Sequence, residues 1–325
     1  MNSGSIHVIG GCGSSGTTLL AFLLDNAHSD VWVGPESNVF CHPSLYGGGD
    51  FKRRLFAAFR GDTPRVYVPL GDYKFPLDPG PFLRVPSYHG LTVDDEYDCF
   101  ASANRLADVG ARIHEKIRAE HSLPESFMWV DQTPKNALTA VDFLKEFPES
   151  TFVHLLRDGR DVAWSLARRY SRELFGGAMA ASPSAFLPIG AARWAYDVSA
   201  AIKARGMPGY LEIRYEDLVA DPLRVINTIL TEQFRRPAID EAYLNADRTH
   251  HTNPAAWNIF MGGSKPSWGT QPGKGVDKAR VGSWRREGPA AEIEALADHR
   301  FEVFGSVEGQ REFSFGAVLE AAGYR

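Results

Sequence analysis

The sequence of 325 residues has few cysteines, no strong charge of either sign and no long hydrophobic run. Its three cysteines, Cys12, Cys41 and Cys99, are odd in number and widely spaced, so they fit neither a disulfide framework nor a metal-ligand pattern. The net charge of −5 gives no reason to expect nucleic acid as a partner. No apolar stretch reaches the length of a membrane span and no secretory signal opens the chain, so we expect a cytoplasmic protein.

A glycine- and serine-rich loop near the start of the chain is the first feature that indicates a ligand. The apolar-leaning residues Ile6 to Ile9 predict a buried strand, and Gly10 to Gly16 follow it. Thr17 and Thr18 then open an apolar segment compatible with a helix, whose N-terminus gathers backbone N–H groups and partial positive charge. The expected ligand is a phosphate, and the alternative is an ordinary glycine turn. The phosphate would be held by Gly13, Ser14, Ser15, Gly16, Thr17 and Thr18.

The spacing within this loop resembles a nucleotide-binding P-loop that has lost its lysine. Gly11 and Gly16 stand where the P-loop has its glycines, but Thr17 occupies the lysine position. A kinase or NTPase uses that lysine on its terminal phosphates. Without this lysine, the loop is more suited to holding a phosphate than to cleaving a polyphosphate. The absence of the lysine therefore disfavours a small-molecule kinase.

A second strand end predicts a second anion site. Thr151 to Leu156 is apolar at nearly every residue, as a buried parallel strand should be, and it ends in Arg157. An arginine there can fork onto a phosphate. Ser165 lies eight residues later on the predicted helix, where its hydroxyl could reach the same anion. The alternative for Arg157 is an ion pair with Asp158 or Asp161.

Two segments, GSSGTTLL and LLRDGRDVAWS, resemble the two signatures of sulfotransferases that use 3′-phosphoadenosine 5′-phosphosulfate (PAPS). The resemblance implies that the loop from Gly13 to Thr18 holds the 5′-phosphosulfate, and that Arg157 and Ser165 hold the 3′-phosphate. The run RYEDLVADP resembles the turn whose tyrosine, here Tyr215, lies near the adenine; the alternative for Tyr215 is core packing. The family also has a basic loop with a Gly-x-Trp that covers the nucleotide.

This covering loop corresponds to residues 247–288, where Arg285 and Arg286 are candidates for the 3′-phosphate or else solvated arginines. The sequence Gly34-Pro35-Glu36 matches the context of the catalytic base in the branch that includes tyrosylprotein sulfotransferases. The resemblance therefore implies that Glu36 is the base; on spacing alone, Glu36 reads as a helix N-terminal charge or a loop salt bridge.

Two basic residues of the family are missing. Ser14 stands where the family has Lys or Arg, and Gln132 stands where it often has Lys. Such cations help the leaving phosphate bear charge, and losing one electrostatic contact can cost on the order of 10²–10³ in rate. Lys135 is the nearest candidate replacement, while Arg160 and the basic residues of 265–286 are others.

Taken together, the sequence predicts one P-loop-like α/β/α domain over residues 1–325, with a central mainly parallel sheet and a long irregular insertion at about 41–104. The resemblance implies transfer of a sulfuryl group from PAPS to a hydroxyl of a small molecule, sugar or peptide, leaving 3′-phosphoadenosine 5′-phosphate (PAP), without a metal. The alternative is a non-catalytic binder of PAPS or PAP.

Further elements are predicted as strands at Asp30–Gly34, Phe127–Val130 and Tyr210–Ile213, and as helices at Phe51–Phe59, Arg105–Glu120, Ala137–Phe147, Val162–Arg169, Pro188–Ala204 and Glu292–Phe304.

Overall fold

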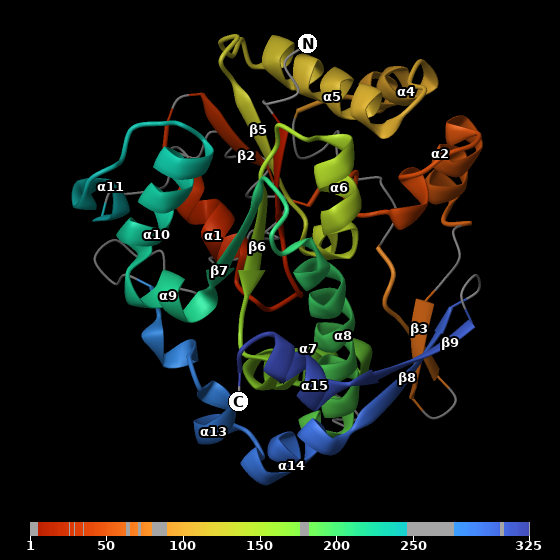
Figure 1. The fold of residues 1–325 in the computed structure, drawn as a ribbon, viewed down its shortest axis with the longest axis vertical. Helices are drawn as coiled ribbons and strands as arrows, with labels where there is room; N and C mark the ends of the chain where they lie inside the picture. Colours follow the sequence, from red (N-terminus) through yellow and green to blue (C-terminus); the bar gives the residue numbers. More distant parts are fainter. Residues whose placement is uncertain are drawn as a thin grey trace.

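Five parallel strands form the central sheet, in the order β2-β5-β1-β6-β7 (Figure 1). The structure, a computed structural model, describes residues 6–25, 27–28, 30–34, 36–62, 66–70, 73–79, 90–175, 182–245, 276–305 and 309–324. Because all neighbouring strands run parallel, their carboxyl ends meet at one edge. The strands are β1 (Ile6–Gly10), β2 (Val31–Gly34), β5 (Met128–Gln132), β6 (Phe152–Leu156) and β7 (Tyr210–Arg214).

Helices cover both faces of this sheet, because successive side chains of a strand point to opposite faces. On β1, Ile6 and Val8 belong to the apolar cluster that includes α5 (Leu106–Glu120) and α6 (Ala140–Glu146). Ile9 belongs to the opposite cluster, which includes α1, α9 and α10. The predicted three-layer α/β/α fold with a parallel sheet is confirmed (Figure 1). The helices of the second cluster are α1 (Thr17–Leu24), α9 (Tyr215–Ala220) and α10 (Pro222–Thr228).

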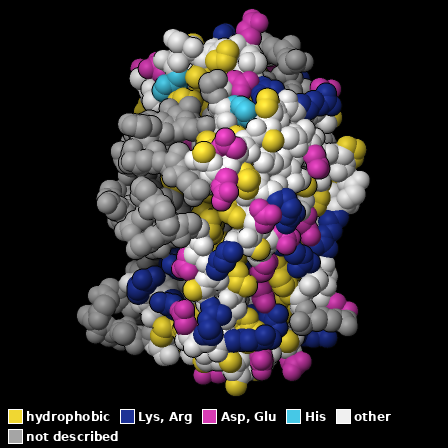
Figure 2. All heavy atoms as spheres, turned by 90° about the vertical axis from the view of Figure 1, so that its left-hand side faces the viewer, with side chains coloured by type: hydrophobic (Ala, Val, Ile, Leu, Met, Phe, Trp, Pro, Cys, Tyr) yellow, Lys and Arg dark blue, Asp and Glu magenta, His cyan; other side chains and the backbone are white. Residues whose placement is uncertain are grey.

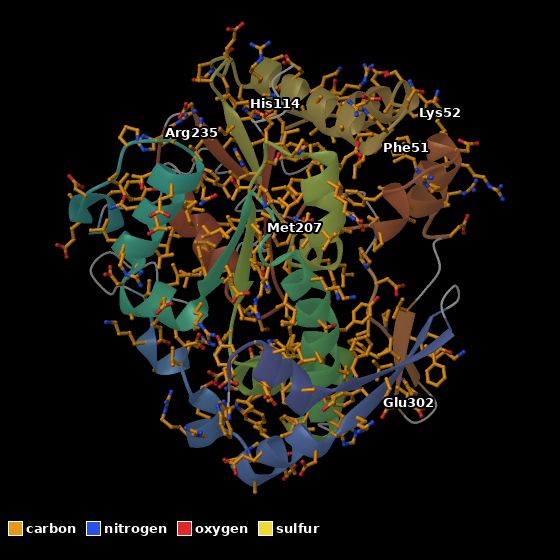
Figure 3. All side chains as sticks on the ribbon, viewed as in Figure 1. Phe51, Lys52, His114, Met207, Arg235 and Glu302 are labelled. Atoms are coloured by element: carbon orange, nitrogen blue, oxygen red, sulfur yellow. The ribbon has the colours of Figure 1, made fainter. Side chains whose placement is uncertain are left out.

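A second, antiparallel sheet joins the insertion to the C-terminal part of the chain, in the order β4-β3-β8-β9. Its strands are β3 (Val66–Leu70), β4 (Tyr73–Pro76), β8 (Arg300–Gly305) and β9 (Gly309–Ser314). The insertion also contains α2 (Phe51–Arg60), with Phe51 buried and Lys52 exposed, and α4 (Val93–Ala101) (Figure 3). The described part of the insertion therefore contributes both helices and strands.

The predicted helix Glu292–Phe304 is wrong in its second half. The helix α14 covers only Ala290–Ala295, and a short 3₁₀ turn, Leu296–Asp298, leads into strand β8. In β8, Phe301 and Val303 are buried while Arg300 and Glu302 are exposed. This alternation has the period of two that a strand with one buried face requires.

The other predicted helices are present, although the helix predicted to end at Arg169 extends to Phe175. The remaining helices and most of the turns lie where no element was predicted. The helices α7 (Gly159–Phe175) and α8 (Leu187–Ala201) pack against each other and against the second sheet. In the described part of the chain, no helix is both long and apolar enough to span a bilayer. Further helices are α11 (Glu241–Asn245), α13 (Ser283–Glu287) and α15 (Phe315–Ala321), with 3₁₀ or π turns at Pro43–Leu45, Pro134–Thr139, Pro183–Phe186, Ile202–Ala204, Ile229–Gln233 and Lys278–Arg280.

Candidate active site

The glycine loop joins β1 to an uncapped helix N-terminus. Helix α1 begins after Gly16, which has φ of 95°, and neither a side-chain cap nor an acidic residue serves its first turn. Ser14 also has a left-handed backbone, with φ of 69°. Within the described residues, the buried Oγ of Ser15 has no hydrogen-bond partner. Unpaired donors at a helix N-terminus suit an anion, so the loop fits the expected phosphate.

Tyr215 lies against this loop, because the absence of a side chain at Gly16 leaves room for its ring. A Cβ on Gly16 would come within 2.7 Å of ring carbons of Tyr215. The Tyr215 side chain is buried in the cluster of α1, α9 and α10, and the Arg157 guanidinium lies 4.5 Å from its ring centroid. Tyr215 is thus a core residue, as the alternative expected, and it also contacts both predicted anion sites.

Arg157 follows β6, the strand next to β1, and its side chain reaches across to the glycine loop. Its Nη1 donates to the Ser14 carbonyl at 3.0 Å and its Nη2 to the Arg280 carbonyl at 2.6 Å. Among the described residues its Nε is buried without a partner. The ion pair with Asp161 is present at 3.7 Å, whereas Asp158 pairs with Arg160 at 2.8 Å. The buried Nε–H of Arg157 therefore remains for an anion beside the loop.

Asp161 fixes the C-terminal segment next to Arg157. Its buried carboxylate accepts hydrogen bonds from the backbone N–H groups of Gly282 and Trp284, at 2.8 and 3.0 Å, and from the Ser283 hydroxyl at 3.0 Å. The Gly-x-Trp of the expected covering loop is therefore tied to the first turn of α7. Most of the remainder of that loop, residues 247–275, lies outside the described residues.

We expect replacement of Asp161 by alanine to lower the free energy of unfolding by roughly 2–4 kcal/mol, because three hydrogen bonds to a buried carboxylate are lost. Denaturant titration measures this loss. The control is Asp277→Ala, since Asp277 is an exposed carboxylate of the same segment that caps only a short turn. Equal stability of the two variants would show that the carboxylate of Asp161 does not hold the segment.

The candidate cations Arg285 and Arg286 lie on the surface beside Trp284. Arg285 stacks on the Trp284 ring at 4.7 Å, with Arg160 at 4.8 Å from the same ring. Arg286 donates to the carbonyls of Val281, at 2.9 Å, and Ala279. Figure 2 shows Lys and Arg side chains gathered, among acidic ones, on the lower part of the face where α13 and α14 lie. Each arginine near Trp284 has an aromatic or backbone partner.

Glu36 lies just past β2, at the same edge of the sheet. The backbone N–H of Ser37 donates to Asp131 at 3.2 Å, and that of Asn38 donates to the Thr133 hydroxyl at 3.2 Å. Burial raises the pKa of Asp131, while the hydrogen bond from Ser37 opposes the rise. These contacts hold the turn after β2 against the end of β5, and the Glu36 side chain is half-buried there.

Gln132 and Lys135, at the end of β5, both make polar contacts inside the protein. The Gln132 Nε2 donates to the Thr17 hydroxyl at 3.2 Å, which links β5 to the start of α1. The Lys135 ammonium is 2.7 Å from the Asp197 carboxylate, and both side chains are almost completely buried. Burial lowers the pKa of Lys135, and Asp197 opposes this shift. The expected replacement cation is therefore already neutralised by a carboxylate.

Two charged residues of α8 were missed by the sequence analysis. Arg193 and Asp197 lie one helical turn apart on a helix that is otherwise apolar and mostly buried. Arg193 donates to the Tyr170 hydroxyl at 2.8 Å, and its Nη2 lies 4.0 Å from the position that a Cβ would take on Gly13. A pair of opposite charges with a spacing of four on an apolar helix was the signal in the sequence.

The strand order therefore brings the predicted residues to one edge in a line: Glu36 after β2, Gln132 and Lys135 after β5, the glycine loop after β1, Arg157 after β6 and Tyr215 after β7. Neighbouring strands are about 4.8 Å apart, so β2 and β1, which Glu36 and the glycine loop follow, are about 10 Å apart across the sheet. Ser165 lies on α7 and is half-buried.

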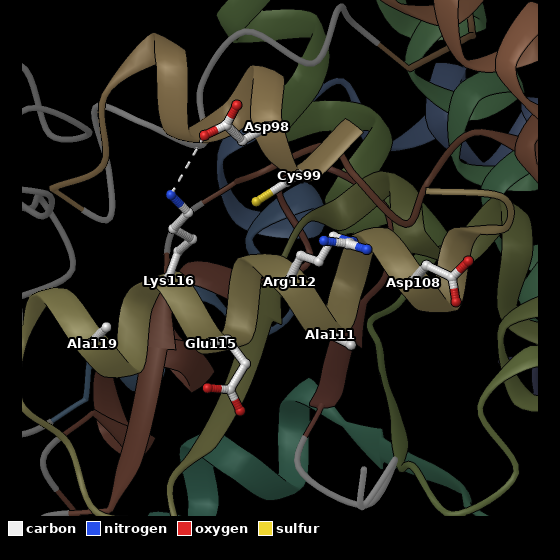
Figure 4. A pocket seen from close by; sticks show the side chains of 8 residues that line it. All are labelled: Asp98, Cys99, Asp108, Ala111, Arg112, Glu115, Lys116 and Ala119. Atoms are coloured by element: carbon white, nitrogen blue, oxygen red, sulfur yellow. Dashed lines mark ion pairs between the residues drawn. The ribbon is translucent and has the colours of Figure 1, made fainter. Parts of the chain in front are cut away.

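A cavity of about 480 Å³ lies elsewhere, on the pair of helices α4 and α5 (Figure 4). Charged residues of these helices line it together with Cys99, Ala111 and Ala119, and Lys116 is 3.8 Å from Asp98 across it. None of the predicted site residues lines this cavity. Among the described residues, no three His, Cys, Asp or Glu side chains are grouped in a way that would hold a metal ion.

Comparison with known proteins agrees with the resemblance seen in the sequence. The family model of the sulfotransferase family matches residues 8–233, which is more than half of the chain. The sulfotransferase domain from the curacin biosynthetic pathway is 19% identical, with a TM-score of 0.53, covering 90% of this chain and 95% of that one. The sulfotransferase domain of the Synechococcus PCC 7002 olefin synthase is 19% identical, with a TM-score of 0.49, covering 90% and 94%. No curated protein matches the sequence.

Proposed function

Because the chain belongs to the sulfotransferase family, we propose that it transfers a sulfuryl group from PAPS to a hydroxyl acceptor. The observation that carries the proposal is the order of side chains along the carboxyl edge of the sheet. Along this edge, Glu36 follows β2, the uncapped glycine loop follows β1, and the buried Arg157 follows β6. Ligands of open α/β sheets bind at this edge. The order places the proposed proton acceptor, Glu36, on one side of the two proposed anion sites, which are the glycine loop and Arg157.

In this proposal, the nucleotide is held by the glycine loop and by the residues next to it. The amides and hydroxyls from Gly13 to Thr18 bind the 5′-phosphosulfate, and the uncapped N-terminus of α1 supports that assignment. Arg157 binds the 3′-phosphate together with Ser165, and the unpartnered Nε of Arg157 supports this role. Tyr215 lies beside the adenine, while Arg285 or Arg286 approaches the 3′-phosphate from the surface. These contacts supply affinity and register rather than chemistry.

Glu36 is proposed as the general base. PAPS supplies an activated sulfuryl group, so the chain needs to orient the acceptor hydroxyl and remove its proton. Glu36 is half-buried and lies at the same edge of the sheet as the loop. General-base help of this kind is worth about 10²–10⁴ in rate. The insertion at about 41–104 is proposed to cover the acceptor, and the loop at 247–288 to cover the nucleotide.

Two alternatives to this proposal are a non-catalytic nucleotide binder and a small-molecule kinase. A non-catalytic binder of PAPS or PAP is suggested by the neutral side chains at Ser14 and Gln132. A small-molecule kinase is disfavoured because Arg157 follows β6, where such an enzyme usually has its Mg-binding aspartate. The three differ in the nucleotide that they bind and in whether they transfer a group.

The test is a pair of measurements on the wild-type protein. Calorimetric titration with PAP, and with ATP and Mg²⁺, shows which nucleotide binds. Transfer of ³⁵S from labelled PAPS to a panel of phenols, sugars, aliphatic alcohols and tyrosine peptides shows catalysis. We expect PAP to bind, ATP to bind far more weakly, and at least one acceptor class to be labelled. Binding of PAP without transfer to any acceptor would favour the binder, and tight binding of ATP with Mg²⁺ would favour the kinase.

A further inference from the structure

A group of charged side chains, buried except for the half-buried Arg193, lies beside the glycine loop. It consists of Lys135 after β5, Arg193 and Asp197 on α8, and the Tyr170 hydroxyl on α7. Burial raises the pKa of the loop residue Cys12, and Asp197 adds to this rise, so the group extends to the loop itself. A charge in such a position is costly unless it has a partner or a ligand.

Helix α8 is held firmly enough to place these side chains. The Trp194 indole N–H donates to the Arg157 carbonyl at 3.0 Å, which ties α8 to the end of β6. A Cβ on Gly190 would come within 2.6 Å of the Ala163 carbonyl oxygen, so α7 and α8 are in close backbone contact. Arg193 directly precedes Trp194, and its position beside the loop is therefore set by packing around the proposed 3′-phosphate site.

The charges in this group do not cancel. The Lys135 ammonium and the Asp197 carboxylate, 2.7 Å apart, form a neutral pair. The Asp197 carboxylate also attracts Arg193, but one carboxylate does not neutralise two cations, and arginine stays protonated at neutral pH. Its neutral partner, the Tyr170 hydroxyl, does not compensate it, because burial raises the pKa of Tyr170. Among the described residues the Arg193 Nε is buried without a hydrogen-bond partner. The group thus keeps one net positive charge, and Arg193 is the member of the group that lies beside the loop and can offer it to an anion.

We propose that Arg193 is the cation that acts on the 5′-phosphate of the donor, in place of the basic side chains absent at Ser14 and Gln132. This inference rests on the proposed function. In the transfer, the bond between sulfur and the bridging oxygen breaks, and its electron pair moves onto the 5′-phosphate. The acceptor oxygen forms the new bond to sulfur and gives its proton to Glu36. Arg193 stabilises the charge that grows on the 5′-phosphate, the role that an oxyanion donor has in other transferases.

Tyr170 is a positioning residue in this arrangement. Its hydroxyl accepts the hydrogen bond from Arg193 at 2.8 Å, and its ring packs on Phe75 of β4 with centroids 4.7 Å apart. Strand β4 belongs to the insertion that is proposed to cover the acceptor. The cation and the acceptor side of the site are therefore linked through one aromatic residue.

The experiment compares Arg193→Met and Arg193→Lys with the matched control Arg236→Met. Arg236 has a buried, unpartnered Nε like that of Arg193, but it pairs with Asp30 at 2.7 Å and contacts the Ser126 carbonyl near the amino edge of the sheet. Its neighbour Arg235 marks this region in Figure 3. Turnover with PAPS is measured, together with the affinity for PAP and for adenosine 3′-phosphate, which lacks the 5′-phosphate.

For Arg193→Met, we expect turnover to fall by about 10²–10³-fold. The affinity for PAP is expected to fall by at least about tenfold, while the affinity for adenosine 3′-phosphate stays unchanged. Arg193→Lys keeps the charge, so we expect smaller losses of turnover and of affinity for PAP. We expect Arg236→Met to change neither the turnover nor the ratio of the affinities for PAP and adenosine 3′-phosphate. If Arg193→Met does not fold, Tyr170→Phe is used, because it removes only the hydroxyl that orients Arg193; we expect its turnover to fall several-fold at unchanged affinity for adenosine 3′-phosphate.

The outcomes separate this inference from the proposed function. Suppose that the wild type binds PAP and transfers sulfate. The role of Arg193 is then overturned if Arg193→Met has wild-type turnover and an unchanged ratio of the affinities for PAP and adenosine 3′-phosphate. The same result for Tyr170→Phe overturns it where Arg193→Met does not fold. Equal loss of affinity for both nucleotides also overturns it, because that result indicates a structural role. If the wild type binds no PAP, the proposed function itself fails.

Discussion

Glu36→Gln is expected to lower the turnover of sulfuryl transfer by about 10²–10⁴-fold, with little change in the affinity for PAP. Glu36 lies after β2, two strands from the glycine loop, and the contacts of Ser37 and Asn38 with the end of β5 hold it at the carboxyl edge of the sheet. Glutamine keeps the size and polarity of the side chain but cannot accept a proton. The loss therefore falls on the chemical step, and steady-state kinetics with a saturating acceptor measures it.

The control for this prediction is Glu146→Gln. Glu146 ends α6 and is also half-buried, and its carboxylate accepts a hydrogen bond from the backbone of Ala107. Because it lies away from the glycine loop, we expect wild-type turnover. Full turnover in Glu36→Gln would show that another group takes the proton, and equal losses in both variants would point to a general effect on folding.

Arg157→Ala is expected to weaken PAP binding by about 1.5–3 kcal/mol, which corresponds to roughly 10–150-fold. The arginine lies one strand from the glycine loop and retains a buried Nε without a partner among the described residues. Adenosine 5′-phosphate has no 3′-phosphate, so its affinity should change much less. Calorimetric titration of both nucleotides distinguishes a contact with the 3′-phosphate from a structural effect.

Arg160→Ala is the matched control, because Arg160 is three residues away and is paired with Asp158 at 2.8 Å. We expect it to bind PAP about as well as the wild type does. Since Arg157 also supports the carbonyls of Ser14 and Arg280, a purely structural role is the main alternative. That alternative predicts equal losses for PAP and adenosine 5′-phosphate.

The parts of the fold that the sequence predicted are those in which local pattern and burial agree. Strands β1 and β6 are apolar at nearly every residue because both of their faces are covered, and each is followed at once by its polar signature. The parallel order then makes these two strands neighbours, as two anion sites for one nucleotide require. Both strands and the central sheet could therefore be predicted from short stretches of sequence.

The features that could not be predicted depend on contacts between distant segments. Strand β3 pairs with β8, more than 200 residues later, and no local signal specifies that partner. The place of Arg193 depends on the packing of Trp194 and Gly190 against α7 and β6. The error at β8 has a different origin, since Phe301 and Val303 alternate with charged residues, and this local pattern favours a strand over the predicted helix.

We propose that one nucleotide spans the glycine loop and Arg157 at neighbouring strand ends. A crystal structure of the protein with PAP tests it most directly. We expect the 5′-phosphate to lie within hydrogen-bond distance of the amides between Gly13 and Thr18, and the 3′-phosphate to contact Arg157. PAP bound at another place, or Arg157 still bonded to the Ser14 and Arg280 carbonyls with no phosphate beside it, would contradict the account.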